Sequence, residues 1–136
     1  MKSLFEESNK INKEFRKSRM KHSSAKAKGR NFQQFVRDVL LKYAPSLLPD
    51  DIRSTSMGAG GEDILFSPAA RKIYPFSVEC KRVEKLNVYE AIKQCEKNSQ
   101  GYTPLVVFRQ NGMKAYAALP LDDLMKLIGE PNTDDF

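Results

Sequence analysis

Apolar residues repeat at a helical spacing in the first third of the chain. They lie at positions i, i+3, i+4, i+7, i+8 and i+11 and comprise Phe32, Phe35, Val36, Val39, Leu40 and Tyr43. This 3.6-residue period predicts a helix that begins near Arg30 and buries one face. We expect Pro45 to end the helix, because a residue that precedes proline rarely adopts the helical conformation. Residues 47–61 are expected to form a loop.

The middle of the chain shows the patterns of strands. We predict a short strand over residues 63–67, a turn or short helical link over residues 67–70, and a longer strand over residues 73–82. One face of the longer strand carries Tyr74, Phe76, Val78 and Cys80. The opposite face therefore carries Ser77, Glu79 and Lys81.

Two more helices are predicted in the second half of the chain. One spans residues 88–98, with Asn87 as its N-cap and Glu90 three residues later completing a capping box. The other spans residues 121–128 and ends at Gly129. Its apolar positions, which we expect to be buried, are Leu121, Leu124, Met125 and Ile128.

Two strands are expected between these helices. The wholly apolar residues 105–108 predict a strand that is buried on both faces. Asn111-Gly112 predicts a two-residue hairpin turn that leads to a strand over residues 115–119. The order of elements is thus helix, two strands, helix, two strands, helix. It predicts an α/β (α+β) fold with a central mixed sheet flanked by helices.

Composition indicates one folded domain in a reducing compartment. The chain has 136 residues, of which 40% are hydrophobic, and this length allows a single core. Its two cysteines, Cys80 and Cys95, lie at apolar positions and form no disulfide framework, so a cytoplasmic location is expected. No apolar run approaches the roughly 18 residues that a membrane span needs, and we predict no membrane partner.

The positive charge is concentrated at the N-terminus. Residues 1–30 contain ten Lys or Arg and three Glu, a net charge of +7, whereas the rest contains 13 basic and 14 acidic residues, a net charge of −1. We therefore divide the chain into a basic arm, helical or flexible, over residues 1–28 and a domain over residues 29–136. Such an arm suits a polyanion such as DNA, because neutralised phosphates release counterions. A solvated tail that only aids solubility is the alternative.

Few residues remain that could carry chemistry. The one histidine, His22, lies in the basic arm, which excludes a histidine-based zinc site and disfavours a Ser-His-Asp triad. Glu79 and Lys81 share one face of a predicted apolar strand, where charges are costly unless they are paired or bind a metal. Asp63 opens the preceding strand, so its carboxylate is expected beside Glu79.

Two neighbouring carboxylates with open water positions suit Mg²⁺ or Mn²⁺. We predict Asp63 and Glu79 as metal ligands and the main-chain carbonyl of Cys80 as a third ligand. Lys81 would orient or help to deprotonate the attacking water and stabilise charge on a phosphate. The alternative is a surface salt bridge between Glu79 and Lys81. Asp50 is a rival for Asp63, but Pro49-Asp50 is more typical of an ordinary turn.

Three stretches of the chain together resemble the PD-(D/E)XK nucleases, and within them the archaeal-type Holliday junction resolvases and related phage nucleases. Each stretch alone is a weak motif, and only the combination is specific. The likeness extends from about residue 28 to residue 128 and implies a restriction-endonuclease-like core. The stretches are Lys28-Gly29-Arg30-Asn31-Phe32-Gln33, then Arg53-Ser54-Thr55-Ser56 leading to Gly61-Glu62-Asp63-Ile64, and Phe76-Ser77-Val78-Glu79-Cys80-Lys81.

The resemblance implies that Asp63 and Glu79 are metal ligands and that Lys81 is the catalytic lysine. Ser54 would support the active site or contact phosphate, and Arg53 would bind phosphate. Gln94 and Ser56 are lower-ranked site candidates, and for Gln94 a purely solvent-facing role is the alternative. The basic residues expected to contact DNA are Lys21, Lys26, Lys28 and Arg30.

Gln33 is a departure from the family pattern. The first helix of these nucleases usually supplies a glutamate four residues after the glycine, and this chain has Gln33 there. Since a neutral amide is a poorer metal ligand than a carboxylate, a second metal would be held weakly or not at all. Gln33 would instead orient a water in the active site, or it marks a weakened or inactive enzyme.

The expected function is a homodimeric, Mg²⁺-dependent endodeoxyribonuclease that cuts branched DNA such as four-way junctions. Two-fold symmetry, implied by the resemblance, would place two active sites on opposite strands. The expected setting is the cytoplasm of a bacterium or of a phage-infected bacterial cell. One alternative is a nuclease for single-stranded or linear duplex DNA, and another is an inactive DNA-binding accessory module.

Overall fold

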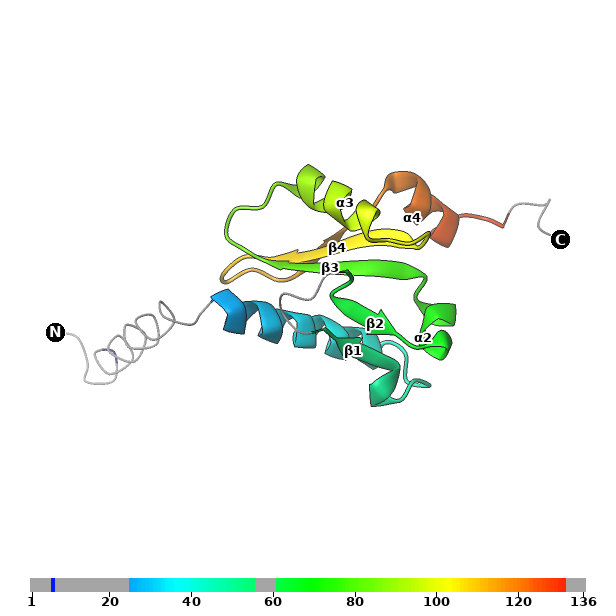
Figure 1. Cartoon of the computed structure of the whole chain (residues 1–136), viewed down its shortest axis with the longest axis horizontal. Coiled ribbons are helices and arrows are strands. Elements are labelled where there is room, and N and C mark those ends of the chain that lie inside the picture. Colours follow the sequence, from blue (N-terminus) through cyan, green and yellow to red (C-terminus); the bar gives the residue numbers. More distant parts are fainter. Residues whose placement is uncertain (1–5, 7–24, 56–60, 132–136) are drawn as a thin grey trace.

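The computed structural model of the chain describes residues 6, 25–55 and 61–131. In this part a small mixed sheet is flanked by helices, which confirms the predicted mixed α/β class (Figure 1). Lys21, Ser56 and all of the predicted arm except residues 6 and 25–28 lie outside the described residues. The first helix covers residues 25–42 and so already includes residues ahead of the predicted start near Arg30.

The remaining helical elements largely follow the predictions. The side chain of Asn87 accepts a hydrogen bond from the amide of Glu90 at 3.2 Å, which confirms the predicted N-cap. The amide of Gly129 donates to the carbonyl of Met125 at 2.7 Å and ends the last helix as expected. These helices are α2 (Pro68–Ile73), α3 (Val88–Lys97) and α4 (Leu121–Ile128). A short 3-10 helix that was not predicted, η1 (Pro49–Asp51), precedes them.

The strands form two groups that meet at Asp63. In one group β3 pairs in parallel with β4, and β4 pairs with β5 in antiparallel; in the other, β1 pairs with β2 in antiparallel. The amide of Asp63, just before β2, donates to the carbonyl of Val78 on β3 at 3.2 Å and joins the two groups. The strands are β1 (Ile52–Ser54), β2 (Ile64–Phe66), β3 (Phe76–Arg82), β4 (Thr103–Arg109) and β5 (Tyr116–Ala118).

The prediction of a loop over residues 47–61 was wrong, because this segment contains η1 and β1. Ile52 is fully buried in β1 and pairs with Phe66 of β2. A strand of three residues is too short to show an alternating pattern, and its stability comes from the partner strand and the core. The predicted long strand also begins later, since residues up to Ile73 belong to α2.

The predicted two-residue hairpin was wrong as well. Asn111 and Gly112 do lie at the centre of a turn, but the last paired residues are Phe108 and Tyr116, so the connection is longer. The carboxylate of Glu84 accepts from the amide of Asn111, and Arg82 donates to the Asn111 side chain. The turn is therefore held against the segment that follows β3 instead of closing directly on the strands.

Two core clusters lie on opposite faces of the strands. The helix over residues 25–42 and the β1–β2 pair enclose the first, and α3 packs on the second (Figure 1). The face predictions for β3 and the predicted two-sided packing of β4 are thus confirmed. The buried members are Phe32, Val36, Ile52, Ile64, Ala70 and Val78 in the first cluster, and Ala91, Cys95 and Val106 in the second.

Several residues that were expected in the core are exposed. In the first helix the exposed fraction is 41% for Phe35 and 73% for Tyr43. In α4 it is 68% for Leu121 and 67% for Ile128, and Met125 is also exposed. Helical periodicity shows that a helix is amphipathic, but it does not show whether another element covers every position of the apolar face. Among the described residues, no helix is long and apolar enough to cross a membrane.

Ser67 connects three elements, which makes its removal a test of the fold. Its hydroxyl donates to Asp51 at 2.7 Å and accepts from the amide of Ala70 at 3.1 Å, capping α2. Ser67→Ala should lower the free energy of unfolding by about 1 kcal/mol or more, as loss of a helix cap does. Urea denaturation measures this. Ser46→Ala, at an exposed turn position, is the control, and equal stability of the two variants would contradict the assignment.

Candidate active site

The backbone of Asp63 is fixed from two sides. Its carbonyl accepts from the amide of Thr55 at 2.9 Å and from the Thr55 hydroxyl at 3.2 Å, while its amide donates to β3. Gly61, two residues earlier, has a φ of 98°, a conformation that glycine adopts without strain. The backbone at Asp63 is thus positioned by the conformation of Gly61 and by hydrogen bonds to Thr55, which follows β1, and to β3.

The Asp63 carboxylate lies against β3. Its Oδ2 accepts a hydrogen bond from the amide of Cys80 at 2.7 Å. Because the N–H and C=O of one strand residue point to the same edge, the Cys80 carbonyl faces the same side of β3 as Asp63. The predicted proximity of Asp63 to the Glu79-Cys80-Lys81 segment is therefore present in the structure.

Glu79 and Lys81 form an ion pair on the face of β3 that packs against α3. The Lys81 ammonium lies 3.2 Å from Glu79 Oε1 and also donates to Oε1 of Gln94 on α3 at 3.4 Å. The Glu79 side chain is only 14% exposed. This burial is greater than that of an ordinary surface salt bridge, and the contact brings Gln94 into the site.

The two carboxylate oxygens of Glu79 have different surroundings. Oε1 pairs with Lys81, whereas Oε2 is buried and has no hydrogen-bond partner among the residues that the structure describes. A buried, unsatisfied carboxylate oxygen costs free energy unless a cation or donor occupies the space beside it. The Glu79 carboxylate is therefore only half satisfied by Lys81.

The electrostatics of the site show that both acids act on the same region. Burial raises the pKa of the Asp63 carboxyl, and the Cys80 amide and the Lys81 charge oppose this rise. The pKa of the Cys80 thiol is raised by burial first and then by the negative charges of Asp63 and Glu79. Burial also raises the pKa of Cys95 to about 11, so both cysteines remain neutral thiols near neutral pH.

The donor set fits a hard divalent cation. Mg²⁺ commonly takes one or two protein carboxylates and fills its other positions with water and substrate oxygens. Asp63, Glu79 and the carbonyl of Cys80 supply oxygen atoms of this kind, and the unsatisfied Glu79 oxygen is the direct sign of fit. In the described segments no three His, Cys, Asp or Glu side chains converge, so a site with a full protein ligand set is not formed there.

The other predicted site residues of the first helix and of β1 differ in how deeply they are buried. Gln33 is 5% exposed and follows Phe32 on the inner side of the first helix, as expected for a residue directed at the sheet. Ser54 is half-buried at the end of β1, beside Thr55, which contacts Asp63. Lys26 and Arg30 are exposed, and Lys28 is half-buried, all on the first turns of the helix.

Arg53 and Asp50 lie elsewhere. Both line a hollow of about 240 Å³ beside Leu65, Phe66 and Ser67. Because alternate residues of a strand point to opposite faces, Arg53 does not share a face with Ser54. The choice of Asp63 over Asp50 is consistent with this placement.

Sequence reasoning missed the pair Glu62–Arg71. Arg71 of α2 lies 2.9 Å from the Glu62 carboxylate, donates to the carbonyl of Phe76, and lies over the ring of Tyr102 at 3.8 Å. The pair holds the residue before Asp63 and the start of β3 in fixed positions. Glu62 is therefore turned to α2. No periodic pattern marks this contact, since it depends on how α2 folds back on the strands.

Comparison of the chain with protein-family models, with curated proteins and with solved structures finds no match. The geometry around Asp63, Glu79 and Lys81 is therefore the basis of the function proposed below.

Asp63→Asn should stabilise the metal-free protein near pH 7. The raised pKa means that burial disfavours the charged carboxylate in the folded state, and asparagine is neutral while it still offers an oxygen to the Cys80 amide. The gain should disappear as the pH falls below about 4, where the aspartate is protonated in both states. Thermal unfolding in a chelator measures this. Lower stability of the variant at pH 7 would contradict it.

Proposed function

We propose that the chain is a metal-dependent endodeoxyribonuclease with a restriction-endonuclease-like core of the PD-(D/E)XK type. The observation that carries the proposal is the environment of the Glu79 carboxylate on β3. One of its oxygens pairs with Lys81, and the other is buried and has no partner among the described residues. The Asp63 carboxylate binds the amide of the next residue on the same strand, Cys80. Two carboxylates can hold a divalent ion that activates water for hydrolysis of a phosphodiester, and an adjacent amine can stabilise the negative charge that develops.

Asp63, Glu79 and the Cys80 carbonyl would hold Mg²⁺ or Mn²⁺. The ion, when bound, lowers the pKa of water and neutralises charge on the phosphate. Lys81 is held by Glu79 and Gln94 at the same place, where its ammonium can stabilise negative charge that develops on the phosphate oxygens. Gln94 acts as a positioning residue for Lys81, and Gln33 is a neutral polar residue on the inner side of the first helix.

DNA is the proposed substrate because the positive charge of the chain is concentrated around residues 1–30. Branched DNA and a homodimer follow from the resemblance to junction resolvases, and the cytoplasm of a bacterium or phage-infected bacterium is the corresponding setting. Single-stranded and linear duplex DNA are substrates of the same chemistry. An inactive DNA-binding module would lack metal dependence.

Cleavage of a panel of substrates tests the proposal. Four-way junction, flap, duplex and single-stranded DNA are incubated with the full chain at one salt concentration, with Mg²⁺ or with a chelator. We expect cleavage with Mg²⁺ alone, and Lys81→Ala should reduce the rate about 100-fold or more, as loss of one charge-stabilising donor does. Lys97→Ala, at an exposed position on α3, is the matched control.

Two results would contradict the proposal. One is unchanged cleavage by Lys81→Ala, and the other is absence of cleavage of every substrate by a folded wild-type protein that binds DNA. The second result would favour the accessory module.

A further inference from the structure

A second hollow lies beside the candidate active site, on the same face of the sheet. It has a volume of about 290 Å³, the lower end of the range for small-ligand pockets. Its lining combines aliphatic, aromatic and basic side chains, chiefly Val83, Leu86, Phe108, Met113, Lys114 and Tyr116. We refer to it as the hairpin pocket.

The strand register places the hairpin pocket next to Lys81. Lys81 of β3 is paired with Phe108 of β4, and Phe108 is paired with Tyr116 of β5. Directly paired residues project to the same face of a sheet, about 5 Å apart. Lys81, Phe108 and Tyr116 therefore form a row that crosses the sheet, and the backbones of Lys81 and Tyr116, two strand spacings apart, are separated by roughly 10 Å.

The pocket presents flat rings together with positive charge. Phe108 and Tyr116 are stacked, with centroids 6.2 Å apart and planes inclined by 26°. Tyr116 is nevertheless 47% exposed, and the Lys114 ammonium lies 5.6 Å from its ring centroid. A partly exposed aromatic ring beside a cation, in a hollow that also has aliphatic lining residues, suits a planar ring attached to a phosphate.

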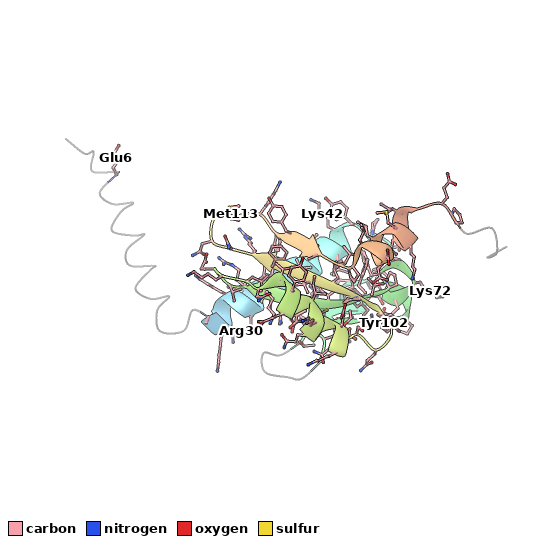
Figure 2. All side chains as sticks on the ribbon, turned by 90° about the horizontal axis from the view of Figure 1, so that it is seen from above. Glu6, Arg30, Lys42, Lys72, Tyr102 and Met113 are labelled. Carbon is pink, nitrogen blue, oxygen red and sulfur yellow. The ribbon has the colours of Figure 1, made fainter. Side chains whose placement is uncertain are left out.

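The surroundings of the pocket carry further positive charge. Arg109 reaches from β4 over the ring of Phe35 on the first helix at 5.7 Å, so the hairpin and that helix are in contact. Figure 2 shows Met113, at the turn, and Arg30 at the same end of the molecule, with Tyr102 and Lys72 at the other. Lys26 and Arg30 are both exposed on that helix. The hairpin end of the molecule is therefore basic, although the first helix packs on the face of the sheet opposite to the pocket.

We infer that the hairpin pocket binds an unpaired nucleobase of the strand whose phosphate lies at Lys81. The inference rests on the proposed function and makes it more specific. The distance of roughly 10 Å corresponds to about three nucleotides of stacked strand at ~3.4 Å each, and to fewer when the strand is extended. A paired base enters a pocket only after it is extruded from the duplex at a cost in free energy, so the preferred DNA has a single-stranded segment next to the cleaved bond.

Binding without catalysis tests this inference separately from the nuclease activity. All variants are made in Lys81→Ala and assayed in a chelator, so that failure of metal chemistry cannot affect the result. Fluorescence anisotropy compares a single-stranded oligonucleotide, the same oligonucleotide with abasic sites, and a blunt duplex. Tyr116→Leu removes the exposed ring and keeps apolar bulk.

Tyr43→Leu is the matched control. Tyr43 is also exposed and has a lysine, Lys42, at the same distance of 5.6 Å from its ring, but it does not line the pocket. We expect Tyr116→Leu to weaken binding of the single strand about 5-fold or more, the usual effect of losing one base–aromatic stack. Tyr43→Leu should leave the affinity unchanged. The abasic oligonucleotide should bind equally to the protein that retains Tyr116 and to the Tyr116→Leu variant.

Equal loss of affinity for the single strand and the duplex, or no loss in Tyr116→Leu, would overturn the inference. So would an abasic oligonucleotide that binds as tightly as the intact one. Sedimentation velocity on the same variants shows whether the pocket instead receives a second copy of this chain, since Tyr116→Leu would then lower the sedimenting mass.

Discussion

The hydrogen bond from the Cys80 amide to the Asp63 carboxylate is the contact on which the site depends. Together with the bond from the Asp63 amide to Val78, it attaches the β1–β2 pair to the free edge of β3. The same two hydrogen bonds thus join the two groups of strands and bring one acidic side chain to the Glu79-Cys80-Lys81 segment. Architecture and candidate chemistry are therefore coupled at Asp63.

This arrangement is unfavourable without a cation. Burial raises the pKa of Asp63, and one oxygen of Glu79 lacks a partner among the described residues. Lys81 compensates only part of the negative charge, because it pairs with a single Glu79 oxygen and shares its ammonium with Gln94. Perturbed charges of this kind cluster at functional sites, and this supports the proposed metal centre over a purely structural ion pair.

Local patterns predicted much of the fold and part of the geometry of the candidate site. The side-chain alternation of β3 placed Glu79 and Lys81 on one face, and the Asn87 cap fixed the start of α3, because both depend only on neighbouring residues. Features set by distant contacts were missed. β1 is too short for a pattern, and Glu84 determines where the β4–β5 turn docks. The Glu62–Arg71 pair depends on the return of α2 to the strands.

The apolar side of α4 also depends on contacts that the sequence does not show. Its amphipathic pattern could not reveal that Leu121 and Ile128 remain exposed. The hairpin pocket was likewise hidden from the sequence. The β4–β5 register brings its lining residues Phe108 and Tyr116 together, and the β3–β4 register places Lys81 next to Phe108.

Diffraction from crystals grown with Mn²⁺ would test the central claim most directly. Anomalous difference density should show a single ion coordinated by oxygens of residues 63 and 79, at about 2.0–2.2 Å, the range typical of small hard divalent cations. Crystals that show no anomalous peak between these two side chains at saturating Mn²⁺, with Lys81 still paired to Glu79, would contradict the account.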